Sequence, residues 1–225
     1  MNLNQVIELT SIRPGTAPQV IKETTLLAIQ TQCRAIVLNY QDLGLAQKVK
    51  TSVNSSIKVV VIGNFPWMYQ DWVDTVKYLD KDWDELDVLM PAQYYNITTK
   101  HDEVLSRFID QLKINFKDKP IKLILETVWL RQAYKEYWQD KLRTLARYCY
   151  NHDLIIKTNS GLFPVHTFEE LCEEIAIIRK TTRKSIIKAA GGIKTVEQVK
   201  KLISLRTDYI GTSNLELVKQ LNEEK

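Results

Sequence analysis

Short apolar runs alternate with longer amphipathic segments eight times along the 225-residue chain. The apolar runs are predicted strands, at Val6–Leu9, Ala35–Asn39, Lys58–Ile62, Leu86–Met90, Lys122–Glu126, Leu154–Lys157, Ser185–Lys188 and Asp208–Gly211. The amphipathic segments are predicted helices, at Pro18–Gln30, Gly44–Val53, Trp72–Leu79, Asp102–Asn115, Leu130–Asn151, Thr167–Lys180, Thr195–Ser204 and Leu215–Asn222. Strands that alternate with helices run parallel, and eight of them close into a barrel. The pattern therefore predicts an α/β fold, a (β/α)8 TIM barrel, with residues 1–225 as one domain.

Charge and cysteine content exclude several classes of protein. The formal net charge is +4, from 31 basic and 27 acidic residues, and no concentrated Lys/Arg block indicates a nucleic-acid partner. Cys33, Cys149 and Cys172 are odd in number and widely spaced, so neither a disulfide framework nor a zinc site is expected. No apolar run is long enough to cross a bilayer, and the first residues do not resemble a signal peptide. We expect a cytoplasmic protein without a membrane partner.

Two lysines end similar apolar runs. Lys157 follows Leu154-Ile155-Ile156 and precedes small polar residues and Gly161, while Lys188 follows Ser185-Ile186-Ile187 and precedes Ala189-Ala190-Gly191-Gly192. A single such lysine is usually a strand-end residue that extends to solvent. Two of them at corresponding strand ends would face the same mouth of a barrel, where burial and mutual repulsion lower a lysine pKa. A neutral lysine amine is a nucleophile that forms a Schiff base with a carbonyl.

An acidic residue and a set of glycine-containing loops complete the predicted site. Asp87 lies within an apolar strand and is either a satisfied structural carboxylate or a proton carrier that works with Lys188. Glycines after the last strands allow backbone N–H groups to approach an anion, although tight turns use the same residues. Barrels often bind phosphate in these loops. The expected phosphate-binding residues are Thr158, Gly161, Gly191, Gly192, Gly211, Thr212 and Ser213.

With these motifs, in this order, the chain resembles the deoxyribose-phosphate aldolase family. The resemblance rests on Glu85-Leu86-Asp87-Val88, Leu123-Ile124-Leu125-Glu126-Thr127, Ile155-Ile156-Lys157-Thr158-Asn159-Ser160-Gly161, Ile187-Lys188-Ala189-Ala190-Gly191-Gly192-Ile193 and Ile210-Gly211-Thr212-Ser213. It implies cleavage of 2-deoxy-D-ribose 5-phosphate to D-glyceraldehyde 3-phosphate and acetaldehyde in deoxyribonucleotide catabolism, with no metal or other cofactor. It also implies that Lys157 forms the Schiff base, that Lys188 perturbs it and that Asp87 relays protons.

The chain departs from the family pattern at several positions, and these departures leave alternative functions open. Glu8 replaces an aspartate and Asn159 a hydroxyl residue, while Val37 and Tyr40 replace a cysteine and a proline. These departures leave open a Schiff-base aldolase that acts on a different aldehyde pair. A barrel that binds a sugar phosphate without catalysis is the other alternative. The expected partner is a small phosphorylated sugar, and the number of subunits stays open, with a homodimer among the alternatives.

Overall fold

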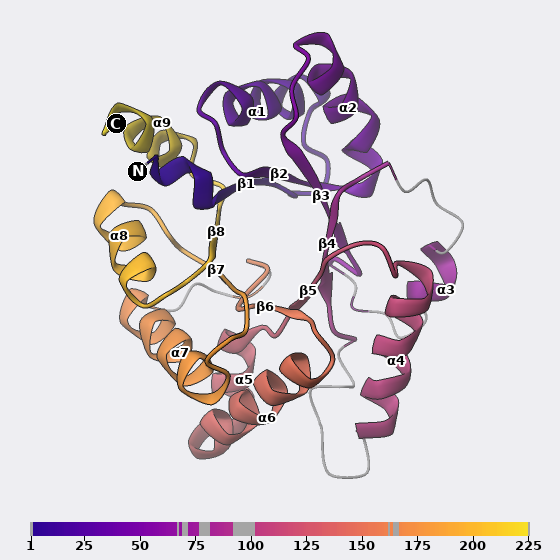
Figure 1. The fold of residues 1–225 in the computed structure, drawn as a ribbon, viewed down its shortest axis with the longest axis vertical. Coiled ribbons are helices and arrows are strands. Elements are labelled where there is room, and N and C mark those ends of the chain that lie inside the picture. The colour runs from indigo at the N-terminus through magenta and orange to yellow at the C-terminus, as the bar shows by residue number, and fades with distance from the viewer. Residues whose placement is uncertain are drawn as a thin grey trace.

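The computed structural model describes residues 2–66, 68, 72–76, 82–91, 102–161, 163 and 167–224, and it forms a closed parallel barrel (Figure 1). Consecutive strands pair in order around the barrel, and β1 pairs with β8 to close it. The strands are β1 (Ile7–Ser11), β2 (Ala35–Asn39), β3 (Lys58–Gly63), β4 (Glu85–Leu89), β5 (Ile121–Ile124), β6 (Ile155–Lys157), β7 (Ile187–Ala190) and β8 (Tyr209–Thr212). The predicted (β/α)8 fold is confirmed.

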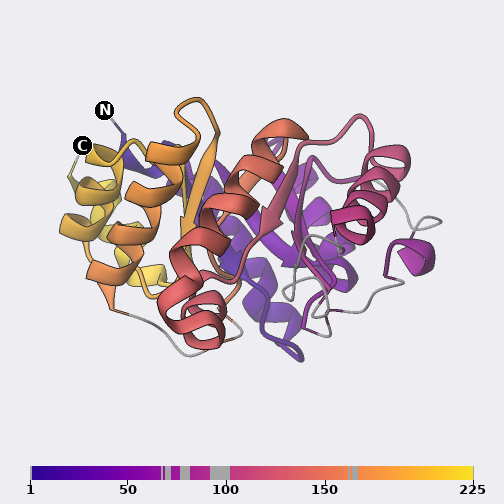
Figure 2. The same ribbon diagram turned by 90° about the horizontal axis from the view of Figure 1, so that it is seen from below.

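Helices surround the barrel and follow the strands in the predicted alternation (Figures 1 and 2). They are α1 (Pro18–Gln30), α2 (Leu43–Ser52), α3 (Trp72–Val76), α4 (Asp102–Asn115), α5 (Thr127–Tyr134), α6 (Trp138–Asn151), α7 (Phe168–Thr181), α8 (Val196–Ser204) and α9 (Leu215–Glu223). Short 3-10 helices cover Leu3–Val6, Tyr40–Asp42 and Lys135–Tyr137. Residues 77–79 of the predicted third helix lie outside the described residues. No helix among the described residues is long and apolar enough to cross a membrane.

One predicted helix is wrong in its extent. The pattern from Leu130 to Asn151 predicts a single helix, but the chain forms α5 and α6, joined by the 3-10 turn Lys135–Tyr137. Lys135 has φ 44° and ψ −117°, which a helix cannot contain. The apolar residues of this pattern nevertheless pack into the core. Leu142, Leu145 and Cys149, on α6, are all buried. Side-chain periodicity continues across the break, so it could not reveal the turn.

Threonine residues cap the starts of two helices near the C-terminus, α7 and α8. Thr167 and Thr195 each accept a hydrogen bond from the backbone N–H three residues later, and Glu170 and Gln198 return one to the cap residue. These capping boxes satisfy N–H groups that a helix start leaves without partners. They fix where the loops after β6 and β7 end.

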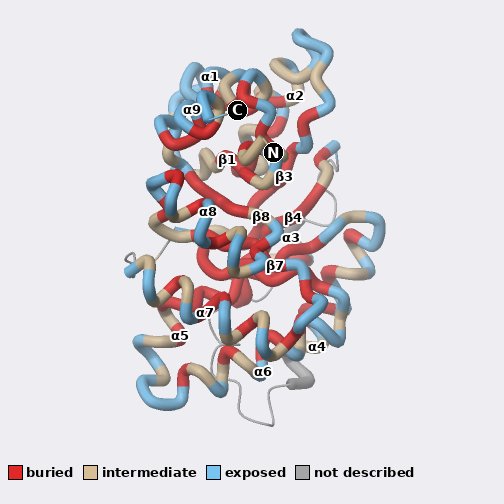
Figure 3. The backbone as a smooth tube through the Cα atoms, turned by 60° about the vertical axis from the view of Figure 1, so that its left-hand side comes forward, coloured by how far each residue is buried: buried red, intermediate tan, exposed pale blue. Residues whose placement is uncertain are grey.

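Strand side chains alternate between the helices outside and the barrel interior. On β4, Leu86 and Val88 belong to the large core between strands and helices, whereas Glu85 and Asp87 point inside. The strands are buried almost throughout, and exposed residues gather on the outer sides of the helices (Figure 3). The register places Asp87 beside Lys122, and Lys157 beside Lys188. Neighbouring inward residues at one level therefore form a ring of charge inside the barrel.

Candidate active site

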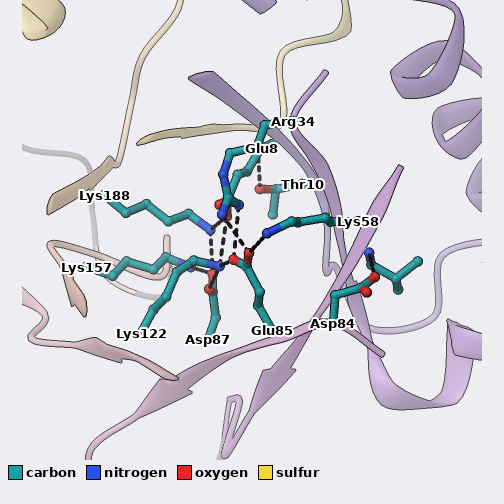
Figure 4. A network of polar contacts seen from close by, with 11 residues as sticks. Glu8, Thr10, Arg34, Lys58, Asp84, Glu85, Asp87, Lys122, Lys157 and Lys188 are labelled. Carbon is teal, nitrogen blue, oxygen red and sulfur yellow. Dashed lines mark hydrogen bonds and ion pairs between the residues drawn. The ribbon is translucent and has the colours of Figure 1, made fainter. Parts of the chain in front are cut away.

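Lys157, Lys188 and Asp87 meet inside the barrel. Lys157 ends β6, Lys188 lies on β7 and Asp87 lies on β4. The Nζ atoms of the two lysines contact the same carboxylate oxygen, Oδ2 of Asp87, at 2.7 Å from Lys157 and 2.6 Å from Lys188 (Figure 4). All three side chains are buried. The prediction that both lysines face one mouth of the barrel is confirmed, although they are 31 positions apart in the sequence and 70 and 101 positions from Asp87.

A second layer of charges lies deeper in the barrel, toward the N-terminal ends of the strands. Lys122 is fully buried and forms ion pairs with Glu85 at 2.7 Å, Asp87 at 3.2 Å and Glu8 at 3.3 Å. Glu8 also contacts Lys188 through its Oε2 atom. Arg34 closes the layer by contacting both Glu8 and Glu85 (Figure 4). Three carboxylates therefore share the cations, and no two charges form an isolated pair.

The sequence interpretation did not assign Glu85, Lys122 and Arg34 to the site, and it noted Glu8 only as a departure from a family pattern. Their signal is the period-2 spacing along buried strands, which puts Glu85 on the same side as Asp87. Charged residues at alternate positions of otherwise apolar strands indicate a polar barrel interior. Which of these charges meet depends on the register between strands, which the spacing alone does not contain.

Burial and charge lower the pKa of Lys157 to about 8, from an ordinary value of 10.5. Burial is the largest cause, because it disfavours the ammonium form. Asp87 acts in the opposite direction, and the charge of Lys188 lowers the pKa further. The sequence interpretation correctly included both causes but emphasised the cationic neighbour, whereas removal from water has the larger effect. About one Lys157 side chain in ten is then neutral at pH 7, compared with fewer than one in a thousand for an ordinary lysine.

Asp87 remains ionised in this environment. Burial acts to raise its pKa, but the charges of Lys122, Lys157 and Lys188 outweigh burial and hold the pKa well below its usual value. Lys122 shows the complementary effect: burial acts to lower its pKa, yet Asp87, Glu8 and Glu85 together raise it. Asp87 is therefore a carboxylate that accepts a hydrogen bond from each of the two lysines at the strand ends, and it can pass a proton between them.

Buried hydrogen bonds anchor the loop that follows Lys157. The hydroxyl of Thr158 donates to the carbonyl of Ala190 and accepts from its N–H, both at 2.9 Å. Asn159 also donates to the carbonyl of Ala190, at 3.1 Å, and accepts from the hydroxyl of Thr127 and from the N–H of Val128. These bonds connect the ends of β5, β6 and β7. They hold the backbone beside Lys157 and Lys188 in register, so the two amines stay on Asp87.

Glu126, which follows β5, has a structural contact in this loop. Its Oε1 atom accepts a hydrogen bond from the N–H of Ser160 at 2.9 Å. The residue adopts a left-handed backbone conformation, with φ 49° and ψ 61°, directly before α5. This conformation turns the chain from β5 into α5 and brings the buried carboxylate to the loop after Lys157.

The predicted phosphate-binding residues surround the same end of the barrel, but they differ in backbone conformation, exposure and contacts. Gly161, Gly191 and Gly192 have positive φ angles of 90°, 117° and 69°, a conformation that favours glycine and leaves the backbone open to an incoming group. None of these three glycines is fully buried, and Ser213 is exposed. The loops that contain them follow β6, β7 and β8, which are neighbours in the barrel. Their placement fits an anion site beside Lys157.

Two other predicted binding residues have structural contacts. The hydroxyl of Thr212 donates to the carbonyl of Ile193 at 3.0 Å and accepts from the N–H of Asn214 at 3.1 Å, which ties the loops after β7 and β8 together. Gly211 faces the stem of Lys188, where a Cβ atom would lie 3.1 Å from the lysine Cε. Gly211 therefore makes room for Lys188. Thr158, with its hydroxyl bonded to Ala190, likewise serves the scaffold.

Apolar residues line the interior beside the charged cluster. Ile62, Leu89 and Ile124 are buried together on β3, β4 and β5, and Ile12 and Phe65 pack against them from the loops. Ile124 is the neighbour of Lys157 in the strand register. The Lys157 side chain is itself buried, and removal of its amine from water accounts physically for the large effect of burial on its pKa. Among the described residues, no group of three or more His, Cys, Asp or Glu side chains could hold a metal ion.

Comparisons with known proteins find aldolases. A deoxyribose-phosphate aldolase from Natranaerobius thermophilus is 25% identical over 224 residues, covering 97% of this chain and 96% of that protein. One from Aquifex aeolicus is 23% identical over 223 residues, covering 95% and 93%. A solved structure described as QR15, an aldolase, superimposes with a TM-score of 0.84 at 21% identity, covering 100% of this chain and 97% of that one. No family model matches the chain.

The barrel and the similarity to aldolases along nearly the whole chain identify an enzyme of the class I aldolase type. Within this class, full-length relatives share one name, and the motifs that carry the resemblance lie on the strands that form the site. Over nearly its whole length, the chain is similar to deoxyribose-phosphate aldolases.

Proposed function

We propose that the protein reversibly cleaves 2-deoxy-D-ribose 5-phosphate to D-glyceraldehyde 3-phosphate and acetaldehyde through a Schiff base on Lys157. The observation that carries this proposal is a buried lysine with a pKa of about 8 that shares one carboxylate oxygen with a second lysine. Such an amine is neutral often enough at neutral pH to attack an aldehyde. The name of the relatives supports the choice of sugar phosphate, and the barrel of residues 1–225 would carry the whole activity.

The contacts of the two lysines favour Lys157 as the nucleophile. The Nζ atom of Lys188 contacts two carboxylates, Glu8 and Asp87. Lys157 contacts Asp87, ends its strand and is the lysine whose pKa is lowered to about 8. We therefore assign Lys157 as the amine that reacts and Lys188 as the neighbour whose charge acts on it.

The reaction follows from these positions. The Nζ atom of Lys157 adds to C1 of the open-chain aldehyde, and the resulting carbinolamine loses water to become a protonated imine. The C3 hydroxyl then gives up its proton, the C2–C3 bond breaks, and its electron pair moves to the imine nitrogen. Glyceraldehyde 3-phosphate leaves, and an enamine remains on Lys157. A proton returns to C2, and hydrolysis of the imine releases acetaldehyde. Asp87 and Lys188, which are in contact, would carry the protons.

The phosphate group would bind at the glycine loops. The open backbone at Gly161, Gly191 and Gly192 offers N–H groups, and Ser213 adds an exposed hydroxyl at the start of α9. Thr158, Gly211 and Thr212 would shape this site through their structural contacts. In such an arrangement the phosphate would lie at one side of the mouth, and the aldehyde carbon would lie at Lys157.

A trapping experiment tests the assignment. Acetaldehyde with sodium borohydride should reduce the imine and add an ethyl group to one lysine, which peptide mass spectrometry would locate at Lys157. The Lys157→Arg variant keeps the charge but cannot form the adduct, so it should show neither the label nor turnover. Label on Lys188, or a fully active Lys157→Arg variant, would refute the assignment. A coupled assay that measures acetaldehyde released from deoxyribose 5-phosphate separates this activity from another aldehyde pair and from a binding protein.

The cellular setting is also part of the proposal. Cys33, Cys149 and Cys172 are free thiols, which agrees with a reducing compartment such as the cytoplasm. A role in deoxyribonucleotide catabolism is part of the same proposal. A homodimer remains a prediction. Light scattering after size-exclusion chromatography would measure the mass in solution against the 26.2 kDa of one chain.

A further inference from the structure

Arg34 lies directly before β2, at the end of the barrel opposite the proposed mouth, and it binds two buried acids. Its guanidinium forms two hydrogen bonds with Glu85, at 2.6 and 3.0 Å, and a third with Glu8. It also stacks on the ring of Tyr209, 3.7 Å from the ring centre. The Arg34 side chain is only 12% exposed. This paired geometry is one that arginine provides and lysine does not.

A continuous series of contacts leads from Arg34 to the proposed nucleophile. Glu8 contacts Arg34 with its Oε1 atom and Lys188 with its Oε2 atom. Lys188 contacts Oδ2 of Asp87, and Lys157 contacts the same oxygen. Glu85 offers a parallel route, because it binds Arg34 and also Lys122, which pairs with Asp87. A change at the floor of the barrel therefore reaches the amines through groups that are already in contact.

The balance of charge around Lys157 depends on Arg34. The charged groups that act on Lys157 are Asp87 from β4, Lys188 from β7 and Glu8 from β1, and Lys122 from β5 lies on the other oxygen of Asp87. Three acids, Glu8, Glu85 and Asp87, face the buried cations Lys122, Lys188 and Arg34, and Glu85 also binds the half-exposed Lys58. Without Arg34, one negative charge among the three acids is no longer balanced by a positive charge. That charge would favour the protonated form of Lys157.

We propose that Arg34 is a positioning residue for the aldolase reaction: by holding Glu8 and Glu85 on the floor of the barrel, it limits the negative charge that acts on Lys157. The inference rests on the proposed function of Lys157. Arg34 touches neither Lys157 nor the mouth, so its effect is transmitted through Glu8 and Glu85. It differs from a merely structural arginine in one respect, because it changes the protonation of a distant amine.

The test is the pH dependence of kcat/KM between pH 6 and 10 for the cleavage of deoxyribose 5-phosphate. A unit charge at roughly 10 Å in a medium of effective dielectric constant about 20 shifts a pKa by about one. Arg34→Gln should therefore move the acidic limb of the profile upward by about one pH unit, lowering kcat/KM about tenfold at pH 7 and little at pH 10. Arg34→Lys, which keeps the charge, should retain a limb close to that of the parent enzyme.

Glu85→Gln should shift the acidic limb in the opposite direction. It also provides a second test of the proposal if Arg34→Gln does not fold. Neutralising this acid leaves Arg34 and Lys122 with less negative charge, so the acidic limb should move to lower pH. The control is Arg179→Gln, because Arg179 is similarly buried, at 16% exposed, and makes hydrogen bonds and an ion pair outside the site. This control should lower the melting temperature without moving the limb.

The outcomes separate the two proposals. If borohydride labels Lys157 in the parent enzyme but Arg34→Gln and Glu85→Gln both leave the acidic limb in place, the role of Arg34 is refuted and the aldolase assignment stands. A limb that moves equally in Arg179→Gln would also refute it, because destabilisation alone would then explain the shift. If the parent enzyme shows no label on Lys157, the proposed function fails first.

Discussion

Replacing Lys188 by methionine tests the electrostatic account of the site most directly. Methionine keeps an unbranched apolar stem of similar length and removes the charge. The Nζ atoms of Lys157 and Lys188 lie within 5.3 Å of each other, because they contact one Asp87 oxygen at 2.7 and 2.6 Å. Two unit charges about 5 Å apart in a medium of effective dielectric constant about 20 repel by about 3 kcal/mol. Removing this repulsion should raise the pKa of Lys157 from about 8 to about 10.

The neutral fraction of Lys157 at pH 7 then falls from about one in ten to about one in a thousand, so kcat/KM should fall about 100-fold. The assay is kcat/KM for deoxyribose 5-phosphate from pH 6 to 10.5, together with the rate of borohydride-trapped adduct formation on Lys157. Near pH 10 the variant should recover part of the loss, because half of the amine is then neutral. Any deficit that remains at high pH measures the separate role of Lys188 in proton transfer.

An acidic limb that stays near pH 8 in Lys188→Met, with activity lost equally at every pH, would refute this reasoning. That result would mean that burial alone sets the pKa of Lys157 and that Lys188 acts only as a proton carrier. Thermal unfolding of the variant should accompany the assay, because Glu8 loses one of its three cationic partners and keeps Arg34 and Lys122.

Three further predictions address the acid, the phosphate loops and stability. Asp87→Asn should lower kcat by about 10²- to 10³-fold, because the carboxylate that links the lysines can no longer accept a proton, and the acidic limb should move to lower pH. Ser213→Asp should raise KM for deoxyribose 5-phosphate about tenfold or more, because the added negative charge would repel the phosphate, and it should leave KM for unphosphorylated deoxyribose unchanged. The control Ser204→Asp, at an exposed site before β8, should change neither KM. The pKa of Glu85 is lowered to about 2 from 4.5, because hydrogen bonds and charge from Arg34, Lys122 and Lys58 overcome the opposing effect of burial. Its contribution of about 3 kcal/mol should be fully present above pH 4.5 and disappear as the pH falls through 2, so urea unfolding should show Glu85→Gln less stable than the parent at pH 7 and the two converging in acid.

The sequence by itself determined the order of the barrel and singled out the two lysines that meet inside it. Runs such as Leu154–Lys157 are short, apolar and rich in β-branched residues, and the segments between them repeat with helical spacing. Both signals are local, and the physical preferences behind them act over a few residues. The two Thr capping boxes are local in the same way, and they lie where the predicted helices begin, at Thr167 and Thr195.

Local signals could not reveal where the helical pattern breaks or which charges meet. The turn at Lys135 interrupts a stripe whose periodicity continues, because packing against the barrel and not propensity places α5 and α6. Thr158 and Thr212, expected to bind phosphate, instead use their hydroxyls to join neighbouring loops.

Only the tertiary structure decided that Glu8, Lys122, Glu85 and Arg34 belong with the lysines. Glu8 and Lys188 are in contact although 180 positions separate them in the chain. Their meeting depends on the closure of β1 against β8 and on a register that puts inward residues of different strands at one level. The chain's residue types limit what chemistry is available, but a lysine pKa depends on burial and on neighbours within a few ångströms, and those neighbours are assigned only when the barrel closes.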